Sequence, residues 1–230
     1  MAAPEKQTRA TAVRRKMRDD ILAGRLRPGQ RLMFPDLCER YEASVGVVRE
    51  ALTSLVSDGL VRAQAHQGHI VTPLSHADLA ELTIARTTIE PLVLRRSIAN
   101  GDVQWEARLV AAHHVLSRTP RYDADDPQRG SDEWAAAHEE FHEALFAGCD
   151  NSRLLRTTRN LAEEAALYRR WSVPLEANRD VAGEHDELLA AAISRDADLA
   201  AERLCEHIAR TAELLITHSE DEHPSRISAG

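Results

Sequence analysis

The chain has few aromatic residues, few cysteines and no long apolar stretch. Phe, Trp and Tyr together make up 4% of its 230 residues. The three cysteines, Cys38, Cys149 and Cys205, are far apart and form no CxxC pair, which argues against a disulfide framework or a thiolate zinc cluster. No apolar run approaches the roughly 20 residues of a membrane span, and the first residues lack the apolar segment of a signal peptide. We therefore expect a cytoplasmic protein with buried thiols and no membrane partner.

Aliphatic and charged residues take the place of the missing aromatics. Apolar residues make up 43% of the chain, and Ala, Leu, Arg and Glu are abundant, a composition that favours helices packed through aliphatic side chains. A chain of this length can form two ordinary domains, each with its own core. The composition therefore predicts a mainly α-helical protein with two domains.

The charges are unevenly distributed along the chain. The whole sequence carries a net charge of −8, but residues 1–74 contain twelve Lys and Arg against eight Asp and Glu, a net charge of +4. The remaining residues contain 17 basic and 29 acidic side chains. A basic amino-terminal part joined to an acidic remainder suggests a phosphate-binding module attached to a sensing or oligomerising domain.

The amino-terminal part reads as three helices followed by a hairpin. Val13, Met17 and Ile21 recur at four-residue spacing among basic residues, as in an amphipathic helix, and Ser44 is a plausible N-cap for a later helix. The predicted helices span about residues 8–23, 35–41 and 45–56, and the predicted strands span 60–63 and 69–72. This order of elements is that of a winged helix-turn-helix DNA-binding domain.

A specific string in this part resembles a known family. Val48-Arg49-Glu50-Ala51-Leu52, followed by Leu55, Gly59-Leu60-Val61 and Gly68, resembles the winged-helix domain of the GntR family of bacterial transcription regulators. The resemblance implies that the third helix enters the DNA major groove, that the wing reaches the adjacent minor groove, and that Arg49 contacts DNA. An exposed arginine paired with a nearby acid is the alternative interpretation of Arg49.

One part of this motif departs from the family. The family has a Ser-Arg-Thr-Pro run before Val-Arg-Glu-Ala-Leu, whereas this chain has Ser44-Val45-Gly46-Val47, so one base-reading arginine is missing. Specificity would then depend more on Arg49, the wing and the basic first helix. The predicted DNA-binding residues are Ser44, Gly46, Arg49, His66, Gln67, Gly68 and His69.

The rest of the chain is predicted to be helical. Helices are expected at about residues 76–100, 103–118, 131–147, 152–171, 175–194 and 196–219. We divide the chain into a winged helix-turn-helix domain (1–74), an all-helical antiparallel bundle for metal and effector binding and dimerisation (75–220), and a flexible tail (221–230).

The sequence His138-Glu139-Glu140-Phe141-His142 carries the clearest chemical signal. Two histidines four residues apart lie on one helix face and can bind the same metal ion. The string also fits the H-E-x-x-H pattern of zinc peptidases, in which the glutamate is a general base. A catalytic site, a non-catalytic metal site and a chance pair of histidines are all consistent with these five residues.

Two later histidines can complete a metal site. His185 and His207 lie at apolar positions of their predicted helices and can both face the interior of the bundle. A lone histidine there is more often a satisfied core residue, but four histidines on three helices favour metal binding. Nitrogen ligands suit a divalent ion. We expect zinc, with nickel, manganese, cobalt and iron as alternatives.

The helical part also resembles a known domain. Arg86-Thr87-Thr88-Ile89-Glu90, then His138, Phe141, His142 and Leu145, then Glu184-His185 and His207, resemble the FCD ligand-binding domain of the FadR subfamily of GntR regulators. Metal-binding members have an aspartate where this chain has His138, which leaves a four-histidine set. The resemblance implies a small carboxylate effector bound against the metal and a basic residue, for which Arg86 is the candidate and an i, i+4 pair with Glu90 the alternative. Arg169 and Arg170 are secondary candidates.

These observations favour a regulator over a peptidase. A catalytic zinc keeps a position open beside three protein ligands, whereas this motif lies in a predicted closed bundle with two further histidines and is joined to a DNA-binding domain. Glu139 and Glu140 are then expected on the outside of their helix. We predict a homodimeric repressor, not an enzyme, that binds an inverted repeat in double-stranded DNA and responds to a small carboxylate. A metal-sensing regulator remains the alternative.

Overall fold

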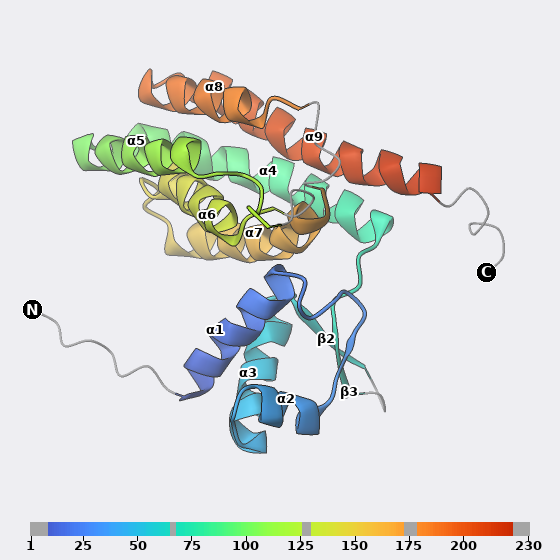
Figure 1. Cartoon of the computed structure of the whole chain (residues 1–230). Coiled ribbons are helices and arrows are strands. Elements are labelled where there is room, and N and C mark those ends of the chain that lie inside the picture. The colour runs from blue at the N-terminus through green and yellow to red at the C-terminus, as the bar shows by residue number, and fades with distance from the viewer. Residues whose placement is uncertain (1–8, 65–67, 126–129, 173–178, 223–230) are drawn as a thin grey trace, which may run out of the picture. The chain divides into compact units, whose positions relative to one another are not determined.

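The structure is a computed structural model that describes residues 9–64, 68–125, 130–172 and 179–222, and Figure 1 shows the course of the chain. The described residues form two compact units that divide after Ser75. Helices dominate both units, as the composition predicts. No helix in the described part of the chain is long and apolar enough to cross a membrane.

The first unit is a winged helix-turn-helix. Its elements are α1 (Arg9–Leu22), β1 (Arg31–Leu32), α2 (Phe34–Arg40), α3 (Val45–Ser57), β2 (Val61–Gln64) and β3 (Gly68–Val71). The three strands form an antiparallel sheet in the order β1-β3-β2, with Val61 opposite Val71. Strand β1, which has only two residues, was not predicted from the sequence. Val13, Met17 and Ile21 are buried in α1, as their spacing predicts.

Asp20 connects three segments of this unit. Its carboxylate accepts hydrogen bonds from the Tyr41 hydroxyl (2.7 Å), Arg25 Nε (2.6 Å) and Arg40 Nε (2.9 Å). Burial by itself raises the pKa of Asp20, but the bonds from Tyr41 and Arg25 and the charge of Arg40 outweigh it, so the pKa is lowered. Asp20 therefore holds α1, the following turn and the end of α2 together as an anion.

The second unit is a helical bundle. Its helices are α4 (His76–Asn100), α5 (Val103–Arg118), α6 (Asp132–Phe146), α7 (Ser152–Ser172), α8 (Val181–Ile193) and α9 (Ala197–Glu222). Leu94, Leu109, Phe141, Leu188 and Leu204 come from five of these helices and are all fully buried in one core. Helices α6, α8 and α9 all contribute to this core. Their packing brings together the polar residues of the site described below.

Two helix boundaries differ from the sequence prediction by more than one residue, and one predicted cap lacks its hydrogen bond. The helix expected from residue 175 begins at Val181, because the Asp180 side chain caps it by accepting a hydrogen bond from Gly183 N. The last helix extends to Glu222, so the tail predicted from residue 221 begins inside it. Ser44 does occupy the N-cap position of α3, but its side chain makes no capping hydrogen bond.

A close contact joins the end of α6 to α4. The Gly148 N–H donates to Ser97 Oγ at 2.8 Å, and a Cβ atom at Gly148 would lie 2.4 Å from the Ser97 carbonyl oxygen. Any residue larger than glycine would therefore push the two segments apart. This contact fixes the carboxyl-terminal part of α4 relative to α6, the helix that carries two of the four histidines.

Helix α4 runs through Pro91 without ending. Proline has no N–H, so the carbonyl of Thr87 loses its usual helical donor. The Cys205 thiol of α9 lies 3.7 Å from this carbonyl oxygen and donates to it. The contact compensates part of the missing bond and ties α9 to the middle of α4.

Candidate metal centre

Four histidines from three helices meet inside the bundle. His138 and His142 come from one face of α6, His185 from α8 and His207 from α9, and all four are buried. Each offers one nitrogen such that the four nitrogens lie within 4.8 Å of one another. The four-residue spacing on α6 places the first two rings side by side, with centroids 4.4 Å apart. The structure thus brings together all four histidines predicted as metal ligands.

Four of the eight ring nitrogens of this cluster have no hydrogen-bonding partner in the described part of the chain. Among the described residues, nothing pairs with His138 Nδ1, either ring nitrogen of His142, or His185 Nε2. Burial, followed by the neighbouring imidazoles and nearby arginines, lowers the pKa of His138 and His142 well below the usual value, and burial and His207 do the same for His185. The rings are therefore neutral and their lone pairs are free to bind a cation. Unpaired buried nitrogens of this number fit a divalent metal ion.

A carboxylate fixes the orientation of His207. Glu184 Oε2 lies 2.8 Å from His207 Nδ1, and Arg179 Nη2 lies 2.6 Å from the same oxygen. Burial raises the pKa of Glu184, but the bonds from His207 and Arg179 more than offset it, so Glu184 stays ionised. His207 Nδ1 then carries the proton and Nε2 faces the other histidines, the arrangement of a metal-bound histidine held by a carboxylate. This role of Glu184, which directly precedes His185, was not predicted from the sequence.

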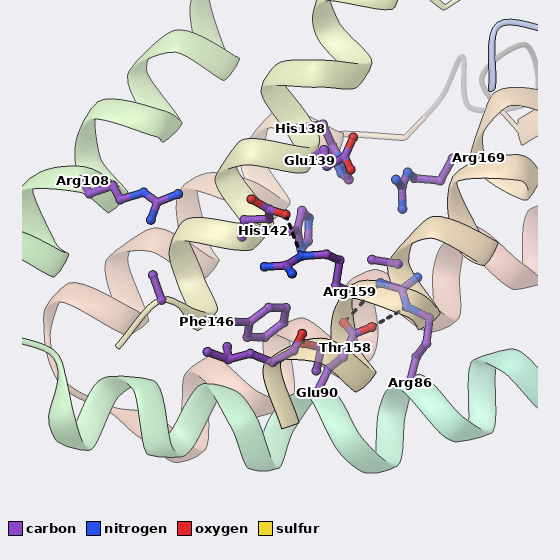
Figure 2. Close-up of a pocket in the computed structure, with 14 residues that line it drawn as sticks. Arg86, Glu90, Arg108, His138, Glu139, His142, Phe146, Thr158, Arg159 and Arg169 are labelled. Atoms are coloured by element: carbon purple, nitrogen blue, oxygen red, sulfur yellow. Dashed lines mark hydrogen bonds and ion pairs between the residues drawn. The ribbon is translucent and has the colours of Figure 1, made fainter. Parts of the chain in front are cut away.

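A cavity of about 270 Å³ opens beside the cluster, and His138 and His142 form part of its wall (Figure 2). Its other polar side chains come from α4, α5, α6 and α7. Four of them are basic: Arg86, Arg108, Arg159 and Arg169. Three are acidic: Glu90, Glu139 and Glu143. The cavity thus joins a cation site to an arginine-rich wall.

Arg86 lines this cavity and also pairs with Glu90. Its Nε lies 2.6 Å from Glu90 Oε1, and Arg86 and Glu90 are 8% and 1% exposed. The effector and ion-pair interpretations of Arg86 are therefore compatible with each other. On α7, Arg159 Nε lies 3.4 Å from Glu143 Oε1 of α6. Arg108 and Arg159 could not be predicted as cavity residues, because nothing in their local sequence distinguishes them from other helical arginines.

One expectation about α6 is wrong. Glu139 was expected on the outside of the helix, but it is half-buried and lines the cavity. Glu140 is exposed, as expected, and pairs with Arg108 at 2.8 Å. The helix turns 100° per residue, so the position after His138 lies at the edge of the cavity instead of opposite it.

The predicted DNA-binding residues occupy the start of α3 and the start of β3. Arg49 is exposed, and its guanidinium carbon lies 5.7 Å from the centroid of the Phe34 ring. The His69 ring packs edge-on against the same Phe34, at 6.1 Å. Phe34, which the sequence analysis did not single out, therefore joins the third helix to the wing strand. Among the described ion pairs none involves Arg49.

The other predicted DNA-binding residues are placed as follows. Ser44 and Gly46 lie at the amino end of α3, and Gly68 begins β3 with a positive φ of 83°, a conformation that glycine adopts without strain. His66 and Gln67 lie outside the described residues.

Comparison with known proteins identifies both units. Residues 9–71 match the model of bacterial regulatory proteins of the gntR family, and residues 81–210 match the FCD domain. The chain is 40% identical over 196 residues to the transcriptional regulator BphR of Paraburkholderia xenovorans, covering 84% of this chain and 79% of that protein. It is 34% identical over 199 residues to the transcriptional repressor GlaR of Escherichia coli, covering 84% and 90%.

Solved structures agree with this assignment. A GntR regulator from Rhodococcus sp. RHA1 superimposes with a TM-score of 0.73 at 25% identity, covering 91% of this chain and 98% of that one. Escherichia coli McbR, at 21% identity and a TM-score of 0.74, shares the fold. These relatives are transcription regulators and not enzymes. The chain belongs to the GntR family of bacterial transcription regulators, with an FCD domain following its DNA-binding domain.

Proposed function

We propose that this protein is a repressor whose FCD domain binds a divalent metal ion and a small carboxylate, and that binding of the carboxylate weakens its hold on operator DNA. The observation that carries the proposal is the position of His138 and His142. They belong to the four-histidine cluster and also line the arginine-rich cavity. A ligand in this cavity would touch both the cation and the arginines. The relative GlaR, which is named a repressor, supports the direction of regulation.

The metal would be held by His138, His142, His185 and His207. Zinc suits four nitrogen donors in tetrahedral geometry, and nickel, cobalt, manganese and iron also accept imidazole. When bound, the ion supplies a positive centre to which a carboxylate oxygen can coordinate. Because every donor is a neutral imidazole, the bound ion would keep its positive charge. Glu184 would fix the tautomer of His207.

The effector would lie between this centre and the arginines. The arginines of the cavity wall outnumber its glutamates, and the cation adds to the positive charge. Arg86 is held in place by Glu90, so it can donate to a carboxylate without first losing side-chain freedom. Arg159 and Arg169 offer further donors on α7. A cavity of about 270 Å³ suits a small organic acid.

The first domain would bind DNA as one half of a symmetric dimer. We assign residues 1–74 to DNA binding and residues 75–220 to effector binding and dimerisation. Ser44, Gly46 and Arg49 would enter the major groove, with His66, Gln67, Gly68 and His69 of the wing at the adjacent minor groove. A two-fold symmetric dimer matches an inverted repeat.

A second function has a specific observation in its favour. Four histidines can fill the tetrahedral shell of zinc by themselves, which leaves no position for a carboxylate. The ion would then be the signal, and the protein would be a metal-sensing regulator.

Thermal denaturation with small mono- and dicarboxylates, with and without chelator, separates the two functions. An effector that acts through the ion stabilises only the metal-loaded protein, by RT ln(1 + [L]/Kd). Under the main proposal the same acid weakens operator binding by at least about tenfold, which requires about 1.4 kcal/mol of differential binding. Metal alone changing operator affinity, with no acid having any effect, favours the metal sensor. Equal stabilisation of the chelated and metal-loaded protein would contradict the carboxylate mechanism.

Replacing Arg49 tests the DNA-binding assignment separately. Arg49→Ala is expected to weaken specific operator binding by about 1 to 3 kcal/mol if the guanidinium contacts a base. The measurement is fluorescence anisotropy with operator and scrambled duplexes at fixed salt. Arg62→Ala on β2 is the control for loss of a basic charge from the same unit. Unchanged discrimination between the two duplexes would remove Arg49 from the base-reading surface.

A further inference from the structure

The outer face of α4 carries an exposed stripe of seven residues. Ile84 is 67% exposed and Leu92 is 52% exposed, and Thr88 lies midway between them. The same face of the helix continues at both ends. The α4 stripe consists of Ala77, Glu81, Ile84, Thr88, Leu92, Arg95 and Ala99, all of them exposed. Spacings of three and four residues keep these positions on one side of the helix.

The order of residues along the stripe is self-complementary about Thr88. Ile84 and Leu92 lie four residues to either side of Thr88, and Glu81 and Arg95 lie seven residues to either side. Two copies of α4 can pair antiparallel about a two-fold axis that passes through Thr88. A residue that precedes Thr88 in one helix then lies opposite the residue that follows Thr88 by the same number of positions in the other helix. Ile84 would then meet Leu92 of the partner subunit, and Glu81 would meet Arg95 of the partner subunit. Apolar side chains meet at the centre and opposite charges at the rim.

The ends of the stripe also allow close approach. Ala77 and Ala99 are small and lie eleven residues to either side of Thr88, so neither end obstructs an antiparallel partner. The Thr88 hydroxyl donates to the Ile84 carbonyl at 2.7 Å, which satisfies its polar group within its own helix. Arg95 forms an ion pair with Asp198 of its own chain, but the Asp198 side chain is 90% exposed, so this pair contributes little stability. Arg95 can therefore pair with Glu81 of the partner subunit instead.

We propose that the α4 stripe is the surface through which two copies of this chain associate, with their α4 helices antiparallel and crossing at Thr88. This inference rests on the dimer in the proposed function and names its interface. We identify the partner as a second copy of this chain, because the stripe is complementary in shape and charge to the same stripe in the antiparallel direction. Binding to a different protein would not require this symmetry. The exposed valines of α5 form no such symmetric series, because Val110 lies seven residues from Val103 but five residues from Val115.

Sedimentation of the full-length protein over a range of concentrations tests the interface. Leu92→Glu is expected to raise the dimer dissociation constant by at least about a hundredfold, because it puts a carboxylate opposite Ile84 of the partner subunit. Val110→Glu is the matched control, since Val110 is 48% exposed on α5 and should leave the dimer unchanged. A Leu92→Glu dimer of normal strength, or equal dissociation of both variants, overturns the proposal.

A charge exchange at the rim tests the antiparallel register. Glu81→Arg and Arg95→Glu should each weaken the dimer, and the double variant should recover at least about tenfold over either one. Single variants that weaken the dimer without recovery in the double variant overturn the register and with it the proposal. This pair also decides the matter if Leu92→Glu fails to fold.

The proposed function can be tested separately on the same variants. A monomeric Leu92→Glu protein should still be stabilised by zinc, because the histidine cluster lies within one chain. If the variant stays dimeric while zinc and carboxylate responses are intact, only the interface is wrong. If the parent protein is monomeric at all concentrations, the interface is wrong whatever the metal response.

Discussion

Replacing His142 by leucine should change the stability of the protein in opposite directions with and without metal. Both ring nitrogens of His142 are buried and unpaired among the described residues. A buried polar atom without a partner costs about 1–3 kcal/mol, whereas leucine fills a similar volume with no polar atom. In the presence of chelator, His142→Leu is therefore expected to be more stable than the parent protein by about 1–2 kcal/mol.

With saturating zinc the order should be reversed. The parent protein gains about 4 kcal/mol at a zinc concentration a thousandfold above its dissociation constant. If the loss of one of four ligands weakens binding by about a hundredfold, the variant forfeits about 2.7 kcal/mol of this gain.

Urea denaturation followed by circular dichroism, with chelator and with zinc, measures both states. His114→Leu is the control, because His114 is exposed on α5 and outside the cluster. Equal destabilisation of His142→Leu in both conditions would show that His142 has a structural packing role and would refute the reasoning.

The remaining predictions concern a supporting residue, the ligand set and the first unit. Glu184→Gln is expected to weaken metal binding by about 10- to 100-fold in calorimetric titration, because His207 loses the anion that fixes its tautomer, and an unchanged affinity would argue against this role. His138→Asp should keep the site and raise the affinity for manganese relative to nickel in competition experiments, since a carboxylate is the harder ligand, and complete loss of binding would contradict the assignment of His138. Asp20→Asn should lower the free energy of unfolding of the first unit by about 1.5–3 kcal/mol in urea. The pKa of Asp20 is lowered in the folded state, so its contribution is present above about pH 4 and is lost as the pH falls through the folded pKa. The difference between this variant and the parent should therefore shrink in acid, and a constant difference would show that the charge is unimportant.

The sequence predicted the fold because local signals and packing agree along most of the chain. Val13, Met17 and Ile21 lie at helical spacing and are all buried, and Gly24 ends their helix with a positive φ of 71°. The errors arise where local signals are weak. Strand β1 has two residues and depends on pairing with β3, which the local sequence does not encode. The start of α8 depends on the cap that the single residue Asp180 provides.

The candidate site was predictable only in part, for a physical reason. The four histidines could be found because two share a helix face and two lie at apolar positions, where a polar side chain requires an explanation. The cavity wall is different. Arg108 and Arg159 come from α5 and α7, and their meeting beside His142 depends on how these helices pack, which no spacing within either helix reveals.

Under the proposed function, a tilt of α4 would have its fulcrum at the Gly148–Ser97 contact, near the carboxyl end of the helix. The helix begins at His76, 21 residues before Ser97, and a rise of 1.5 Å per residue gives an arm of about 32 Å. A tilt of about 2° around the fulcrum therefore displaces the first turn of α4 by about 1 Å. Arg86 and Glu90 lie along this arm, so under the proposed function a ligand that drew them slightly inward would displace the first turn of α4 further than it displaced them. A larger side chain at Gly148 would shift this contact, and would therefore change how far a given movement of Arg86 and Glu90 displaces the first turn of α4.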